Sequence, residues 1–358
     1  MNKLSDRSSS RLVAYWVLLG VMMLLIQVIL GGITRLTGSG LSITEWNVVT
    51  GALPPLNEQQ WVTEFDKYKQ TPQFHLLNAD FSLPDFKFIF FWEWFHRLWA
   101  RLVGVVFIIG FIYLVWKKKL KREMVKPLLI LFLLGALQGA VGWIMVASGL
   151  TGEAIYVAPT RLALHFIFAL GLICYALWFA LVLLIPRGEI IYHTRLRLWS
   201  VIIFVVLIFQ LSFGALMAGL KAAATAPTWP TVNGDWIPSS LFTKRPILQN
   251  FVGNPITIQF IHRLLAYLLL ILVLIWSMQA FKISTSSAYL RRVRWLPLSG
   301  IIVQVVLGIS ALLTSPGIIP NHWVFFDWIA AWHQFTGMLI LLLMVYMLFL
   351  VRPVIRVG

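Results

Sequence analysis

The chain has 358 residues, of which 59% are hydrophobic and only 12% are charged, and its mean hydropathy is +0.84. No soluble domain can bury that much apolar surface, so the composition excludes a soluble protein and indicates one that crosses a membrane several times. The formal net charge of +16 would suit a nucleic-acid partner, but the distribution of that charge along the chain argues against one.

Eight apolar stretches are long enough to cross a bilayer, which takes about 20 helical residues. They cover residues 12–33, 89–116, 127–148, 160–185, 196–219, 257–280, 295–314 and 329–351. The first is too long for a signal peptide and no small-residue cleavage site follows it, so we expect it to remain as a membrane helix. No Arg- and Ser-rich transit segment precedes it, which favours a bacterial plasma membrane over an organelle.

The basic residues gather on one predicted side of the membrane. With both termini in the cytoplasm, 18 of the 29 Lys and Arg residues fall in the inner segments 1–11, 117–126, 186–197, 281–294 and 352–358. The same segments contain only three acidic residues, Asp6, Glu123 and Glu189. This is the positive-inside asymmetry of membrane proteins. The positive charge therefore orients the helices, and we predict no nucleic-acid partner.

Two of the predicted outer loops are long. Loop 34–88 contains a predicted helix that starts near Asn57 and carries three aromatic residues at helical spacing, Trp61, Phe65 and Tyr68. That spacing favours a helix lying in the membrane interface. Loop 220–256 is rich in Pro and Trp, which is typical of a segment that caps a helix bundle and does not cross the membrane.

The sequence repeats itself. QVILGGITRL (27–36) matches QLSFGALMAG (210–219), and EWFHRLWARL (93–102) matches QFIHRLLAYL (259–268). LQGAVGWIMVASG (137–149) matches VQVVLGISALLTS (303–315), and LALHFIFALG (162–171) matches AAWHQFTGML (330–339). We therefore predict an all-α polytopic membrane protein made of two repeat-related four-helix bundles of the same orientation, residues 1–185 and 186–358.

Four of the seven histidines occupy equivalent places. Each is expected near the outer end of an even-numbered span, two in each half: His96, His165, His262 and His333. A single membrane histidine is usually a packing residue, but four at matched, repeat-related positions favour ligation. Two imidazoles from facing helices are typical of bis-histidine haem ligation, with one pair in each half. Zinc would need further ligands, and the lone Cys174 lies in the middle of a span, where we interpret it as a packing residue.

Other residues near these histidines fit a macrocycle. Arg97 and Arg263 directly follow a histidine and are predicted to pair with anionic haem propionates. The alternative is that these arginines extend to lipid headgroups. Small residues would let a macrocycle approach the backbone, although they also serve ordinary helix packing. The small residues at these places are Gly104, Gly135, Gly139, Gly142 and Gly308.

The two halves differ three residues before the first histidine of each pair. The first half has Glu93 there and the second has Gln259. Because residues three apart share a helix face, one half carries an ionisable group beside its predicted haem and the other a neutral isostere. This difference predicts one reactive site and one electron-relay site.

Several motifs resemble haem A synthase: GGITRLTGSGLSITEW (31–46), EWFHR (93–97), NPITIQFIHR (254–263) and HQ (333–334). The resemblance covers nearly the whole chain, including all eight spans and the repeat. It implies oxidation of the C8 methyl group of haem O to a formyl group, which gives haem A for cytochrome oxidase. One branch of the family has a cysteine pair in the first outer loop, and this sequence is similar to the branch that lacks it.

The resemblance also implies roles for the two histidine pairs. His96 and His165 would hold the substrate haem O, and Glu93 would be the catalytic carboxylate. His262 and His333 would hold a haem b cofactor. Haem O synthase would deliver the substrate, and a membrane electron acceptor would take up the electrons.

Two other classes of protein remain open. One is a di-haem b-type electron-transfer cytochrome without catalysis on haem. Such cytochromes commonly place two histidines on one helix, whereas no predicted span here contains two. The other is a transporter, which the repeat alone suggests. Transporters usually break their helices near the membrane midplane, and these spans are mostly unbroken.

Overall fold

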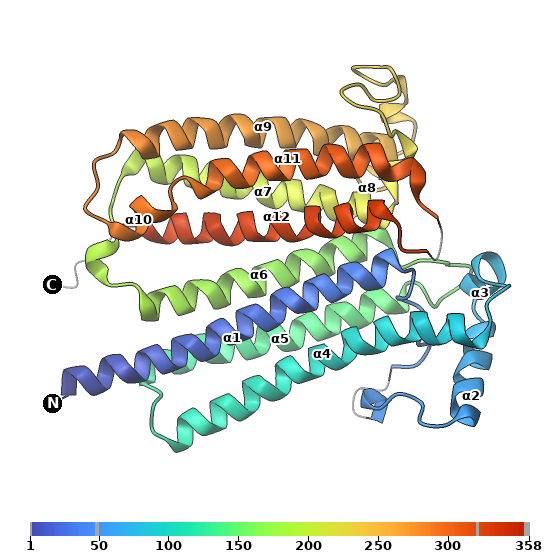
Figure 1. Cartoon of the computed structure of the whole chain (residues 1–358), viewed down its shortest axis with the longest axis horizontal. Helices are drawn as coiled ribbons and strands as arrows, with labels where there is room; N and C mark the ends of the chain where they lie inside the picture. Colours follow the sequence, from blue (N-terminus) through green and yellow to red (C-terminus); the bar gives the residue numbers. More distant parts are fainter. Residues whose placement is uncertain (1, 47–49, 320–321, 354–358) are drawn as a thin grey trace.

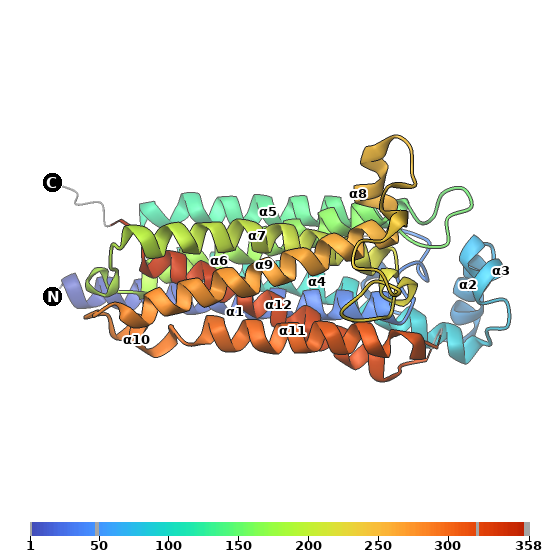
Figure 2. The same cartoon turned by 90° about the horizontal axis from the view of Figure 1, so that it is seen from above.

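The computed structural model describes residues 2–46, 50–319 and 322–353. Within these residues the chain has no β-strand, and eight of its helices are long and apolar enough to cross a membrane. The long helices run side by side along the longest dimension of the molecule (Figures 1 and 2). The predicted all-α polytopic fold is therefore confirmed.

Each long helix corresponds to one predicted span. Their bounds are α1 (Asn2–Leu36), α4 (Leu83–Trp116), α5 (Arg122–Ala147), α6 (Pro159–Leu184), α7 (Thr194–Gly219), α9 (Pro255–Lys282), α11 (Leu296–Thr314) and α12 (Phe325–Leu350). A short helix, α10 (Ala288–Val293), precedes α11. The start of α4 lies earlier than predicted because a capping box begins the helix: the Ser82 amide donates to Asp85 at 2.9 Å.

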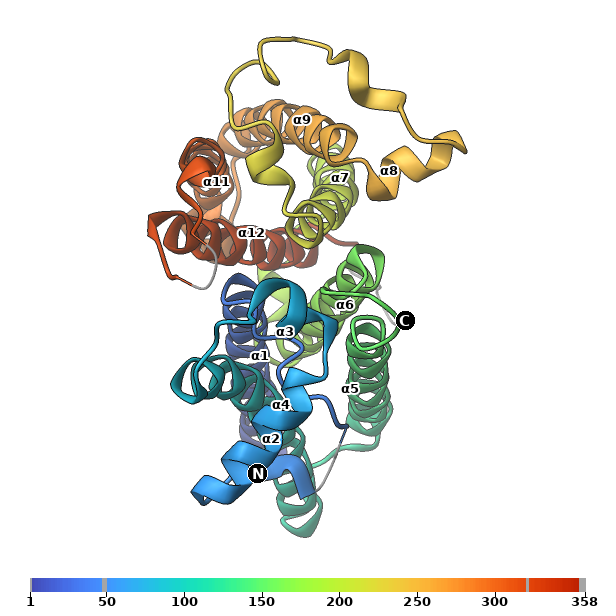
Figure 3. The same cartoon turned by 90° about the vertical axis from the view of Figure 1, so that its right-hand side faces the viewer.

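The long helices form two groups of four, seen from the outer-loop end in Figure 3. In the first group α1 contacts α4 and α6, and α5 contacts α6. In the second group α7 contacts α9 and α12, and α11 contacts α12. These are the pairings expected of two repeat-related halves, 1–185 and 186–358, and that relationship remains a prediction. The groups meet through α6 against α7 and α12, and through α1 against α12.

One helix pairing differs between the groups. Helices α9 and α11 pack against each other, whereas no comparable contact joins their counterparts α4 and α5 within the described chain. The first group is therefore more open on the side where α4 and α5 face each other.

The first outer loop folds onto α4. Its helix α2 (Glu58–Lys69) begins after Asn57, as predicted, with the Asn57 side chain accepting from the Gln60 amide at 3.0 Å. Phe65 and Tyr68 are buried, and their rings stack on Phe86 of α4 with centroids 5.0 and 5.4 Å apart. The aromatic face is therefore covered by α4, whose early start provides an aromatic surface, and the place of α2 in the membrane interface remains a prediction.

Tyr68 connects this loop to the helix bundle. Its hydroxyl donates to Gln73 of α3 (Pro72–Leu77) at 3.0 Å and accepts from Asn78 at 2.7 Å. Burial raises the pKa of Tyr68 to about 12, so the hydroxyl stays neutral. The Gln73 amide in turn donates to the Ile155 carbonyl at 3.2 Å, between α5 and α6. The loop is thus anchored across the outer end of the first group.

The second outer loop contains only short helices: η3 (Ala222–Thr225), η4 (Ser239–Phe242), η5 (Ile247–Gln249) and α8 (Asn250–Gly253). The Asn254 amide donates to the Ser240 and Leu241 carbonyls at 2.9 and 3.2 Å, while its oxygen accepts from the Ile256 amide at 3.0 Å and caps α9. Figure 3 shows this loop over the outer end of the second group, where the composition placed it.

Candidate functional site

A cavity of about 1140 Å³ extends into both helix groups. All four predicted ligand histidines line it: His96 of α4, His165 of α6, His262 of α9 and His333 of α12. Glu93, Arg97, Gln259 and Arg263 line the same cavity. The structure therefore brings every predicted site residue to one place. His96 lies further along its helix than expected, because α4 begins at Leu83.

The second histidine pair has the separation that one iron requires. The rings of His262 and His333 have centroids 6.3 Å apart and planes inclined by 71°. Two imidazoles on opposite sides of one metal, at about 2 Å per bond and roughly 1 Å more to each ring centre, have centroids about 6 Å apart. No cluster of three or more His, Cys, Asp or Glu side chains that suits a metal ion occurs among the described residues. The donor set thus fits a two-imidazole haem site and does not fit a tetrahedral zinc site.

In the first half, three glycines that line the cavity have open space beside them. A Cβ added to Gly104, Gly135 or Gly139 would have no neighbour within 4 Å, and all three line the cavity. The repeat places Leu270, Ile301 and Val305 at the equivalent positions of the second half. The other two predicted glycines have a different environment, since a Cβ at Gly142 or Gly308 would lie 2.9 Å from the ring of His165 or His333.

Glu93 is buried at the edge of the cavity, and both of its carboxylate oxygens have bonding partners. Its Oε2 accepts from the Ser42 hydroxyl at 2.7 Å and the Ile43 amide at 2.9 Å, and its Oε1 forms an ion pair with Arg97 at 2.5 Å. Arg97 also donates to the carbonyls of Glu45 and Ile43, at 3.0 and 3.2 Å. The Glu93–Arg97 pair therefore holds segment 42–45 of the first outer loop against α4.

In the second half Gln259 also binds the neighbouring outer loop, but it donates hydrogen bonds to that loop where Glu93 accepts them. Gln259 is buried and its amide donates to the carbonyls of Ala222 and Ala226, both at 3.2 Å. Arg263 donates to the carbonyls of Ala226 and Thr231, at 3.0 and 2.9 Å. The hydrogen bonds that the structure gives Arg97 and Arg263 thus go to Glu93 and the outer loops, and their pairing with propionates remains a prediction.

Sequence reasoning missed four glutamines beside the histidines. The side chains of Gln27, Gln138, Gln210 and Gln304 each lie within hydrogen-bonding distance of one predicted ligand. A signal was present in the sequence: each glutamine is followed four residues later by glycine, in QVILG, QGAVG, QLSFG and QVVLG.

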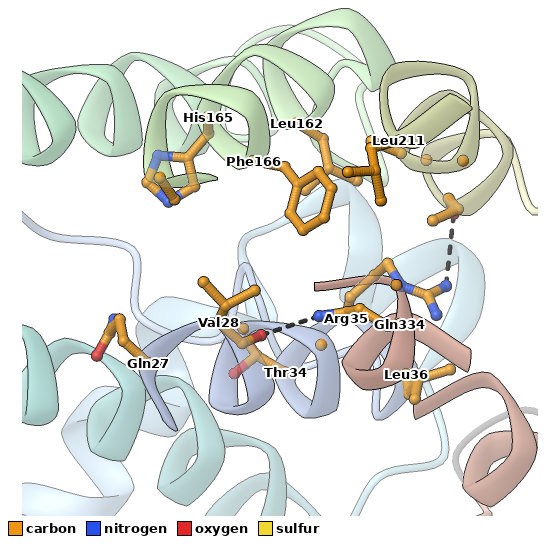
Figure 4. Close-up of a pocket in the computed structure, with 18 of the residues that line it drawn as sticks. Gln27, Val28, Thr34, Arg35, Leu36, Leu162, His165, Phe166, Leu211 and Gln334 are labelled. Atoms are coloured by element: carbon orange, nitrogen blue, oxygen red, sulfur yellow. Dashed lines mark hydrogen bonds between the residues drawn. The ribbon is translucent and has the colours of Figure 1, made fainter. Parts of the chain in front are cut away.

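The two halves are joined by a hydrogen bond beside the histidines. The amide of Gln334, which follows His333 on α12, donates to the Val28 carbonyl of α1 at 3.0 Å (Figure 4). A Cβ at Gly32 would lie 2.8 Å from the Gln334 oxygen, so glycine permits this approach. Arg35 lies nearby, lines the cavity and donates to the Ala218 carbonyl at 3.5 Å. The sequence motifs 31–46 and HQ (333–334) contain these two residues, but sequence reasoning gave neither side chain a role.

Comparison with known proteins identifies relatives over most of the chain. The family model described as cytochrome oxidase assembly protein matches residues 14–345. The heme A synthase of Methylobacterium sp. (strain 4-46) is 42% identical over 342 residues, which cover 94% of this chain and 92% of the relative. That of Bradyrhizobium diazoefficiens is 42% identical over 307 residues, covering 85% and 84% of the two chains. That of Brucella suis is 42% identical over 340 residues, covering 92% and 89%. The chain therefore belongs to the cytochrome oxidase assembly protein family, as a relative of these heme A synthases.

Proposed function

We propose that this membrane protein is an oxidoreductase that converts haem O to haem A by oxidising the C8 methyl group to a formyl group, for the maturation of cytochrome oxidase. The names of its relatives support this activity. The observation that carries the proposal is a single cavity lined by two histidine pairs, with Glu93 three residues before His96 where the other half has Gln259 before His262.

The two halves have different roles in this proposal. His96 and His165 hold the substrate haem O in the half where Gly104, Gly135 and Gly139 have open space beside them. His262 and His333 hold haem b, and the spacing of their rings supports this assignment. When bound there, haem b supplies one-electron redox chemistry that relays electrons from the substrate site to a membrane electron acceptor.

Glu93 provides a fixed negative charge beside the substrate. Converting the methyl group to a formyl group removes electrons and protons while water supplies the added oxygen atom. A carboxylate near the reacting carbon stabilises positive charge that develops there or accepts a proton. Because Ser42, Ile43 and Arg97 hold both carboxylate oxygens, the geometry favours the electrostatic role. The lone pairs that these bonds leave free remain available to a proton.

The eight apolar helices and the charge distribution support a membrane location and an orientation for the protein. The protein lies in the bacterial plasma membrane as a multi-pass protein with both termini in the cytoplasm, which the positive-inside asymmetry supports. Haem O reaches the first-half site from haem O synthase. The histidine-lined ends of the helices and both long loops lie on the outer side.

The variant Glu93→Gln tests the role of the carboxylate. The amide oxygen can still accept from Ser42 and Ile43, and Arg97 keeps its bonds to loop carbonyls, so we expect the variant to fold and to retain both haems. Turnover should fall about 100-fold or more, with haem O or a hydroxylated intermediate accumulating. Chromatography of haem extracted from membranes measures this, beside wild type and a His96→Ala variant that weakens substrate binding. Wild-type amounts of haem A from Glu93→Gln would contradict the assignment.

A further inference from the structure

The four glutamines beside the histidines occur in one repeated pattern, Gln-x-x-x-Gly. It lies on α1, α5, α7 and α11, and in each case the histidine comes from the next long helix of the chain. A spacing of four places the glutamine and the glycine on one helix face, one turn apart. The four units are Gln27 and Gly31, Gln138 and Gly142, Gln210 and Gly214, and Gln304 and Gly308.

Each glutamine amide contacts the ring of its histidine, and in the first half it also lies 3.2 Å from Nδ1 of His96 and of His165. The distances from the glutamine Nε2 to the imidazole Nε2 are 3.2 Å for Gln27 and His96, 3.4 Å for Gln138 and His165, 3.2 Å for Gln210 and His262, and 3.5 Å for Gln304 and His333. In three of the four pairs the same amide also donates to the backbone carbonyl of the histidine, at 3.1, 3.0 and 3.0 Å. The glutamine thus holds both the ring and its helix.

Each glycine forms the other wall of the slot. A Cβ at Gly31, Gly142, Gly214 or Gly308 would lie 3.1, 2.9, 3.2 or 2.9 Å from Cε1 of the corresponding imidazole. Contacts this short are tighter than van der Waals packing normally allows, so a larger residue would push the ring away. The imidazole therefore lies in a narrow slot between an amide and a glycine.

The hydrogen bonding of these slots is incomplete. The Oε1 atoms of all four glutamines are buried and have no hydrogen-bond partner among the described residues, and the same is true of Nδ1 of His262 and His333. Buried polar atoms without a partner are uncommon in folded proteins. Within the described chain, no other side chain is recorded as a hydrogen-bond partner of these four rings.

Iron ligation would create the missing bond. A histidine that binds metal through one ring nitrogen donates the N–H of the other to a nearby acceptor. Turning the glutamine amide about its last bond exchanges its oxygen and nitrogen, which brings the unpartnered Oε1 to the ring. Gln210 suits this turn, because among the described residues its amide does not also donate to the histidine carbonyl. At Gln27, Gln138 and Gln304 the turn would bring two oxygen acceptors to 3.1, 3.0 and 3.0 Å.

We infer that Gln210 is a positioning residue that accepts the N–H of His262 when this histidine binds iron. It fixes the orientation and tautomer of the ring and adjusts how strongly the imidazole donates to iron. A stronger acceptor makes the imidazole a better donor, which stabilises oxidised iron and lowers the reduction potential of the haem. This inference rests on the proposed haem ligation.

The second half provides the test, because its haem b stays bound during turnover. The measurement is the reduction midpoint potential of haem b in the purified full-length protein carrying Gln210→Leu or Gln210→Glu. Removal of the acceptor in Gln210→Leu should shift the potential upward, and the stronger acceptor in Gln210→Glu should shift it downward. The matched control is Gln279→Leu, on the same helix as His262 but far from the cavity, and it should leave the potential unchanged.

A purely structural role for Gln210 would move both variants in the same direction or move neither, and either result overturns the inference. If Gln210→Leu fails to retain haem, Gln210→Glu decides alone: a lowered potential supports the inference and an unchanged or raised one overturns it. Failure of the proposed function is distinguishable, because wild-type protein would then leave haem O unconverted, while failure of the haem ligation would leave wild-type protein without a haem b that depends on His262 and His333.

Discussion

At the residue scale, the hydrogen-bonding groups of the adjacent outer loop explain which residue stands three positions before each His-Arg pair. Glu93 faces a hydroxyl and a backbone N–H of the first outer loop, both of which are donors. Gln259 faces the carbonyls of Ala222 and Ala226, which are acceptors. A carboxylate at position 259 would be repelled by these oxygens. Glu93 therefore also has a structural role, and its variants have to be measured for haem retention as well as turnover.

The histidines of the second half give a prediction at the same scale. Replacing His262 or His333 by Ala leaves one imidazole, which cannot hold a low-spin haem on both sides. The low-spin haem b signal in the absorption spectrum of the purified protein should be lost in either variant. The control is His75→Ala in α3, whose spectrum should match wild type. A wild-type haem spectrum in both the 262 and 333 variants would show that this pair is not the cofactor site.

At the element scale, the first half is built more openly than the second. Helices α9 and α11 pack together, while α4 and α5 have no comparable contact in the described chain. The difference coincides with Gly104, Gly135 and Gly139 on α4 and α5, where the second half has Leu270, Ile301 and Val305. An open pair of helices suits a substrate that enters and leaves, and a closed pair suits a cofactor that stays.

The variant Gly139→Val tests this difference, because it places in the first half the residue type that the second half has at the equivalent position, Val305. A valine side chain would enter open cavity space, so it should exclude part of the macrocycle without straining the helices. We expect haem O retained on purification to fall about tenfold, which corresponds to roughly 1.4 kcal/mol of binding free energy, while haem b is unchanged. Gly171→Ala, in α6 and outside the cavity lining, is the control. An equal loss of both haems would refute the assignment of the first half to the substrate.

The elements that could be predicted from the sequence are those with a local signal. Hydropathy located the eight spans, and the repeat located four equivalent histidines. The packing of Phe65 and Tyr68 on Phe86 could not be predicted, because it depends on contacts between α2 and α4 that helical periodicity does not encode. The glutamines were missed for a related reason: their role becomes visible only when the partner helix places a histidine beside each of them.

At the scale of the whole molecule, the two sites share one cavity and one interface. The Gln334 hydrogen bond to Val28 joins α12 to α1, and these two residues directly follow His333 and Gln27 in the sequence. In the proposed function, electrons withdrawn from haem O in the first half would cross this interface to the second half. Helix α1 begins at the same end of the bundle at which α12 ends (Figure 1). An even number of spans requires this.

The conversion of haem O to haem A is tested by the haem content of membranes that make haem O but no haem A, with and without this chain. Haem is extracted, separated by chromatography and identified by mass. We predict that haem A appears only when the chain is expressed, and that the purified protein carries haem b. Unchanged haem O together with two equivalents of haem b would contradict the account and indicate an electron-transfer cytochrome. Protein that binds no haem would contradict it as well and indicate a transporter.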